Sequence, residues 1–234
     1  MLIAARNGFA SKRRWKNPYP TDGLIAMWDG EWNAGGGKHD PNTTEIIDLV
    51  GNCNLNIIGS VEIGDNYFMP STNGSDDMRS SNPLQGTVRS FDIVLTNSQG
   101  NAGDGKCGIV SFGQNNRGIL KYVEWFGAGV DGTYRMSQYG NVVKTLLYSV
   151  NYNSDSNNTD ILQIFNGVRW TGTTLNWNSK GFDDVAGTEN LVRIQRALPI
   201  GNAKIFNIRV FSRTRTLDEI AAYYAIDKTR FSVP

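Results

Sequence analysis

Short apolar runs separated by polar turns make up most of the chain after residue 22. Several runs alternate apolar and polar side chains with a period of two, as in Ile205–Phe211, and this alternation is typical of β-strands that bury one face. The pattern predicts strands over Leu24–Trp28, Leu55–Ile58, Thr87–Leu95, Gly108–Phe112, Ile119–Phe126, Val142–Val150, Ile161–Phe165, Leu191–Ile194 and Lys204–Phe211.

Two local signals predict specific turns and caps. The Asn166-Gly167 pair between two strand-like runs favours a type I′ hairpin, because both central residues of that turn have positive φ. Thr216 and Glu219 have the spacing of a capping box, in which each side chain binds the backbone N–H of the other residue. We therefore expect a hairpin at 166–167 and one short helix near residues 217–228.

These elements predict an all-β fold with one C-terminal helix. The 26 glycines suit many turns, and the 11% aromatic content supplies a core and argues against disorder. No fixed-period repeat and no Pro/Gly/Ser linker divides residues 23–234. We expect one domain there, a jelly-roll sandwich of two antiparallel sheets.

Residues 1–22 have the composition of a basic N-terminal arm. Residues 1–20 contain no acid, whereas the rest of the chain has 18 basic and 22 acidic residues. We expect the arm to dock on an acidic partner surface, with Trp15 and Tyr19 buried against it; the alternative is an inert leader. A nucleic-acid partner is not expected for the whole chain. The docking residues are Arg6, Lys12, Arg13, Arg14, Trp15 and Lys16.

Export and membrane signals are not expected from the sequence. The apolar stretch before Arg6 is too short for a signal peptide, and the charges follow it instead of preceding it. No window has the ~18 apolar residues of a membrane span. Cys53 and Cys107 lie far apart in apolar runs, which favours free buried thiols and leaves a single disulfide as the alternative.

Four segments together resemble laminin-G-like modules of the concanavalin A-like superfamily. Gly23–Gly30 is similar to their opening strand, and Ile164–Val168 is similar to their Asn-Gly hairpin. Ile205–Arg213 and Leu217–Tyr224 are similar to the closing strand and the C-terminal helix. The resemblance implies a concanavalin A-like jelly roll over residues 23–234. Residues 28–40 also resemble a stretch found in such modules of phages and prophages.

Catalysis is not expected. His39 is the only histidine and lies beside Asp40 in a glycine-rich loop, without a nucleophile motif. Glucanases of the resembled superfamily carry three alternating acids on one strand, whereas this chain has Asp29 and Glu31 followed by Asn33. A glucanase-like glycosidase therefore remains a less favoured alternative.

Calcium is the one cofactor that the resemblance suggests. Modules of that superfamily often hold calcium with loop carboxylates, and oxygen ligands suit this hard cation. The alternative is that these acids cap turns in Gly- and Asn-rich loops. The candidate ligands are Asp29, Glu31, Asp40, Asp76, Asp77, Asp183 and Asp184.

Tryptophans in or beside loops are candidates for stacking on sugar rings. These are Trp32, Trp170 and Trp177, for which packing at the edge of the core is the alternative. The combined prediction is a non-catalytic phage or prophage virion protein, of head-decoration or fibre type. Its jelly roll would bind a glycan or a surface, and its arm would dock on other virion proteins or on further copies. The alternative is a secreted or cell-surface bacterial carbohydrate-binding module.

Overall fold

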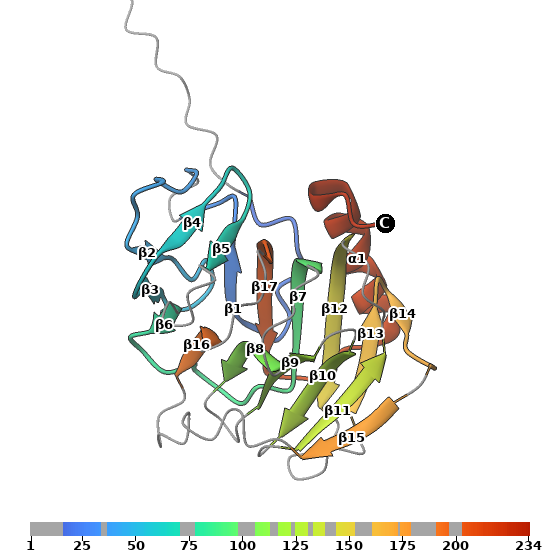
Figure 1. Cartoon of the computed structure of the whole chain (residues 1–234). Helices are drawn as coiled ribbons and strands as arrows, with labels where there is room; N and C mark the ends of the chain where they lie inside the picture. The colour runs from blue at the N-terminus through green and yellow to red at the C-terminus, as the bar shows by residue number, and fades with distance from the viewer. Residues whose placement is uncertain are drawn as a thin grey trace, which may run out of the picture.

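The computed structural model describes residues 16–33, 37–70, 78–97, 106–112, 117–122, 125–130, 133–138, 144–152, 161–172, 174–178, 191–196 and 203–234. Two antiparallel sheets pack face to face, and a C-terminal helix covers the outer face of one of them (Figure 1). The predicted all-β sandwich is confirmed. Within the described residues, no helix has the length and apolar character needed to cross a membrane.

The first sheet is the one whose outer face packs against the helix. In spatial order its strands are β14 (Val168–Arg169), β13 (Ile161–Phe165), β12 (Lys144–Tyr152), β7 (Ser90–Asn97), β17 (Ile205–Phe211), β5 (Phe68–Pro70) and β4 (Val61–Ile63), and β1 (Leu24–Asp29) also pairs with β17. β14 and β4 therefore form opposite edges of this sheet.

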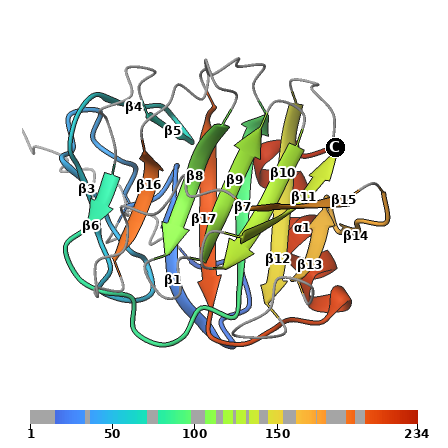
Figure 2. The same ribbon diagram turned by 60° about the horizontal axis from the view of Figure 1, so that its bottom comes forward.

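The second sheet faces the first across the core (Figure 2). Its strands, in spatial order, are β15 (Thr174–Asn178), β11 (Thr133–Gln138), β10 (Trp125–Val130), β9 (Arg117–Tyr122), β8 (Lys106–Phe112), β16 (Val192–Arg196), β6 (Met78–Ser80), β3 (Leu55–Ile57) and β2 (Glu45–Ile46). β14 and β15 follow one another along the chain, and each is the edge strand of its sheet.

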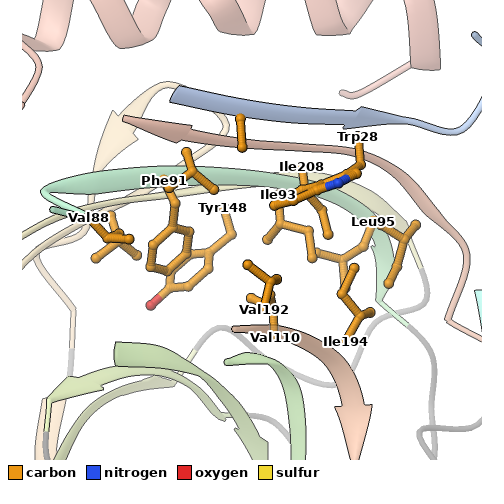
Figure 3. Close-up of a cluster of buried hydrophobic side chains, with 14 of the residues drawn as sticks. Trp28, Val88, Phe91, Ile93, Leu95, Val110, Tyr148, Val192, Ile194 and Ile208 are labelled. Atoms are coloured by element: carbon orange, nitrogen blue, oxygen red, sulfur yellow. The ribbon is translucent and has the colours of Figure 1, made fainter. Parts of the chain in front are cut away.

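Alternating side chains of the first sheet build the core between the sheets. In Figure 3, Phe91 and Ile93 on β7 point toward Val110 and Ile194 of the second sheet. Trp28 on β1 is fully buried in the same cluster. Successive side chains of a strand point to opposite faces, so the intervening positions point toward the helix.

The helix α1 (Leu217–Phe231) buries that outer face. Val94 and Leu147 of the first sheet form a separate cluster with Phe206, Phe231 and Val233. All seven residues of β17 are buried, because the second sheet covers one face of this strand and α1 covers the other.

Both locally encoded elements are confirmed. Asn166 and Gly167 have φ values of 50° and 75°, and Phe165 pairs with Val168 across the turn. The Thr216 side chain accepts from the Glu219 backbone N–H, and the Glu219 carboxylate accepts from the Thr216 backbone N–H. The helix runs three residues beyond the predicted end, to Phe231.

Every segment predicted as a strand contains a strand in the structure, but one predicted strand corresponds to two observed strands. Residues 119–126 were expected to form a single strand, whereas the chain reverses between β9 and β10, with Tyr122 paired to Trp125. Residues 119–126 contain no Gly, Pro or Asn to mark a turn. Several short or polar strands, such as β11, were not predicted.

The predicted arm, residues 1–22, includes two residues that pack in the folded domain. Tyr19 is buried, stacks on Tyr223 with ring centroids 5.7 Å apart, and donates to Asp227 Oδ1 at 2.6 Å. The Tyr223 hydroxyl in turn donates to the Pro20 carbonyl at 2.6 Å. Tyr19 and Pro20 are therefore part of the folded domain, and Tyr19 is buried against this chain instead of a partner.

Of the six predicted docking residues, the structure describes one. This residue, Lys16, is exposed. The predicted docking residues that lie outside the described residues are Arg6, Lys12, Arg13, Arg14 and Trp15.

Of the two cysteines, Cys53 is free and buried. Its thiol lies 3.3 Å from the Asn82 carbonyl, and burial raises its pKa to about 11. For Cys107 the structure describes the backbone, in β8, but not the side chain.

Candidate functional site

The carboxylate of Asp29, at the end of β1, is fully buried and bound by protein donors. Arg230 of α1 donates to both carboxylate oxygens, at 2.8 and 3.0 Å. Asn207 on β17 donates a further hydrogen bond at 2.7 Å. The backbone N–H groups of Glu31 and Trp32 also donate to Oδ1. Asp29 thus ties the start of the following loop to β17 and α1.

Two other predicted calcium ligands lie among the described residues, and protein donors bind each of them. Glu31 lies 3.3 Å from Arg230 Nη2, and Asp40 accepts from the Asn42 backbone N–H in a local turn. Among the described residues, no group of three or more His, Cys, Asp or Glu side chains is arranged to hold a metal ion. Four predicted ligands lie outside the described residues, namely Asp76, Asp77, Asp183 and Asp184.

Two of the predicted sugar-stacking tryptophans come from the same edge of the sandwich. Trp170 directly follows β14, the edge strand of the first sheet, and Trp177 belongs to β15, the edge strand of the second sheet. For Trp177 the structure describes the backbone but not the side chain. Trp32 is half-buried and forms an isolated bridge with Lys38, away from that edge.

Trp170 lines an open hollow of about 400 Å³. Its indole contacts the Phe165 ring edge-on, with centroids 5.3 Å apart and an interplanar angle of 66°. The backbone at Gly172 lies so close that a Cβ there would be 2.5 Å from the indole. Val168 also lines this hollow, and 69% of its surface is exposed. The hollow therefore combines a fixed aromatic ring with an exposed apolar neighbour.

A second hollow lies at the other end of the first sheet, beside the β4–β5 turn. Its volume is about 450 Å³, and Lys38 and His39 line it together with Asp65 and Asn66 of the turn. The sequence did not predict a ligand-binding role for His39, and it did not single out the residues of the turn. Their one signal was an Asp-Asn pair next to Tyr67.

No family model matches the chain, and no curated protein sequence matches it. Its fold is similar to that of the receptor-binding domain of the botulinum neurotoxin C/D mosaic serotype, at 14% identity over 90% of this chain and 53% of that chain, with a TM-score of 0.57. The botulinum neurotoxin serotype D binding domain gives 14% identity over 90% and 53%, with a TM-score of 0.54. Trypanosoma rangeli sialidase gives 12% identity over 92% and 34%, with a TM-score of 0.61.

The chain thus spans about half the length of the neurotoxin domains and about a third of the sialidase. At these identities the likeness concerns the fold alone. It agrees with the fold expected from the sequence, a concanavalin A-like sandwich of two antiparallel sheets.

Proposed function

We propose that this chain is a non-catalytic glycan-binding module that contacts its ligand through the hollow at Trp170. The observation that carries the proposal is the fixed position of the Trp170 indole between Phe165 and the backbone of Gly172, at an open edge of the sandwich. A ring that is already held in place loses little conformational entropy when a flat apolar face of a sugar stacks on it. The concanavalin A-like sandwich fold agrees with such a role.

The proposal extends to the setting in which the module works. The resemblance of residues 28–40 to phage and prophage modules, together with the basic residues before Lys16, supports a virion protein of head-decoration or fibre type. In that setting the basic segment docks the module on other virion proteins or on further copies. A secreted or cell-surface bacterial carbohydrate-binding module is the alternative, and the Trp170 hollow would serve it equally well.

A glycan array followed by calorimetry on the best ligand tests the binding site. We expect Trp170→Ala to weaken binding by a factor of about 30 or more, because truncating a tryptophan at the centre of an interface typically costs about 2 kcal/mol. Incubation with the same glycans is expected to release no reducing ends.

Since Trp170 also packs on the core, a second variant separates binding from folding. Val168→Asp places a charge in the hollow at an exposed position and is expected to weaken binding while the melting temperature stays close to that of the parent protein. Leu217→Asp is the matched control, because Leu217 is also exposed and an acid is tolerated in the first turn of a helix. Unchanged glycan affinity in both Trp170→Ala and Val168→Asp would refute the Trp170 site.

A further inference from the structure

The hollow beside the β4–β5 turn is built from two loops that meet at the end of β1. Lys38, His39 and Pro41 come from the loop after β1, and residues 63–67 form the other wall. Its volume of about 450 Å³ falls within the ~300–1,000 Å³ of typical small-molecule sites. β4 and β14 are opposite edges of the first sheet, so this hollow is separate from the one at Trp170.

Backbone contacts hold both loops in place. The His39 Nε2–H donates to the Asp29 carbonyl at 2.7 Å, since a carbonyl can only accept. Gly30 allows the β4–β5 turn to lie directly against β1, because a Cβ at Gly30 would be 2.6 Å from both the Asn66 carbonyl oxygen and the Tyr67 Cα. The Gly64 N–H closes the turn by donating to the Tyr67 carbonyl at 2.9 Å. The walls of the hollow are therefore preorganised.

The polar side chains of this hollow have free hydrogen-bonding capacity. In the part of the chain that the structure describes, the side chains of Lys38, Asp65 and Asn66 have neither a hydrogen-bond nor an ion-pair partner. Together they offer a cationic donor, an anionic acceptor and an amide that does both. A ligand that fits this set carries donors and acceptors side by side.

The charges of the hollow also restrict the ligand. Lys38 and Asp65 carry opposite formal charges, so an anionic ligand is attracted by one and repelled by the other, and the same holds for a cation. Hydroxyl groups, which donate and accept at one atom, match the set without any net charge. We propose that this hollow is a second carbohydrate site, which binds one neutral hexose residue of a glycan and acts independently of Trp170.

Amide chemical shifts of the full chain test this site. The probes are the methyl glycosides of glucose, galactose and mannose, titrated to tens of millimolar. At least one of them is expected to shift the amides of residues 38–39 and 63–67. Asn66→Ala is expected to weaken that binding about three- to tenfold, as the loss of a hydrogen bond does. Trp170→Ala is expected to leave these shifts unchanged, which separates this site from the function proposed above.

A charge exchange distinguishes direct recognition from a structural role. For the hexose that binds, the matching uronic acid and amino sugar are expected to bind the parent protein more weakly. Asp65→Asn should shift the preference toward the uronic acid, and Lys38→Gln toward the amino sugar, each by about two- to fivefold. The proposal is overturned if none of the three glycosides shifts these amides, if Asn66→Ala does not weaken the binding, or if the two charge variants leave the preference unchanged.

Discussion

Arg209 carries a fully buried positive charge in the middle of β17. Its Nη1 and Nη2 atoms donate to the two Asp227 carboxylate oxygens at 2.9 and 2.5 Å, and its Nε lies 3.2 Å from Asp92 Oδ2. The Tyr19 ring covers the guanidinium, with its centroid 4.3 Å away. Burial raises the pKa of Asp92, but the charges of Arg215 and Arg209 outweigh this effect and hold it below its ordinary value. Buried charges of this kind are tolerated only while every partner is present.

Tyr19→Phe tests how strongly the N-terminal segment supports this cluster. The variant keeps the ring but removes the hydroxyl that donates to Asp227 and accepts from Arg230 at 3.0 Å. A buried carboxylate then lacks one donor. We expect the free energy of unfolding to fall by about 1–3 kcal/mol, seen as a lower urea midpoint with an unchanged m value.

Tyr223→Phe is the matched control. It removes a hydroxyl from the neighbouring ring, but that hydroxyl donates to the uncharged Pro20 carbonyl. Its expected cost is smaller, about 0.5–1.5 kcal/mol. If Tyr19→Phe cost no more than Tyr223→Phe, the link between Tyr19 and the buried charges would contribute nothing of its own.

At the scale of elements, the start of α1 is fixed by a half-buried ion pair as well as by its cap. Arg213 donates to both carboxylate oxygens of Glu219, which also accepts from the Thr216 backbone N–H. The hydrogen bonds from Arg213, and then the one from Thr216, lower the pKa of Glu219 to about 2, from an ordinary value of 4.5.

This lowered pKa makes the helix start sensitive to acid. Between pH 4.5 and about 2 the unfolded chain binds more protons at Glu219 than the folded one, so the stabilisation is complete above this window and disappears as the pH falls through it. Glu219→Gln keeps the capping acceptor but cannot titrate. We expect it to be less stable than the parent at pH 7 by up to about 1 kcal/mol, as is usual for solvent-screened pairs.

Urea unfolding at several pH values measures that difference. It should shrink toward zero as the pH approaches 2. A gap between the two proteins that stays constant from pH 7 to pH 2 would contradict the assignment to Glu219 ionisation.

Elements whose signals lie within a few residues could be predicted from the sequence. The Asn166-Gly167 turn and the Thr216–Glu219 box are examples, because local backbone chemistry determines both. The turn between β9 and β10 has no such signal. The pairing of Asp92 with Arg209 joins positions far apart in the sequence, so no local pattern reveals it.

Of the two candidate sites, one could be predicted from a local signal in the sequence and the other could not. Trp170 could be named from the sequence because a tryptophan next to a hairpin is conspicuous by residue type. The hollow at Lys38 and Asp65 depends on two loops that meet only through the close contact of the turn with Gly30. Asp29 was one candidate calcium ligand, and in the structure the guanidinium of Arg230 lies at its carboxylate.

At the scale of the whole molecule, two truncations locate the boundary of the domain. A chain that starts at Tyr19 keeps the contacts of this residue with Asp227 and Tyr223, whereas a chain that starts at Thr21 loses them. We expect the second chain to melt several degrees below the first, because it loses a buried aromatic side chain and leaves a buried carboxylate short of a donor. Equal melting temperatures would show that Tyr19 and Pro20 do not stabilise the folded domain.

The position of β17 has a consequence for synthesis of the protein. This strand lies between β7 and β1, and among the described residues β17 is the only strand with which β1 pairs. The ribosome makes β1 long before β17, so β1 cannot enter the sheet until residues 205–211 have been made. Until then, the unpaired edges and apolar faces of the nascent chain remain open to chaperones or to aggregation. Folding is thus expected to finish only after residues 205–231 have left the exit tunnel, and a chain that stops before Ile205 should be degraded or recovered as aggregate.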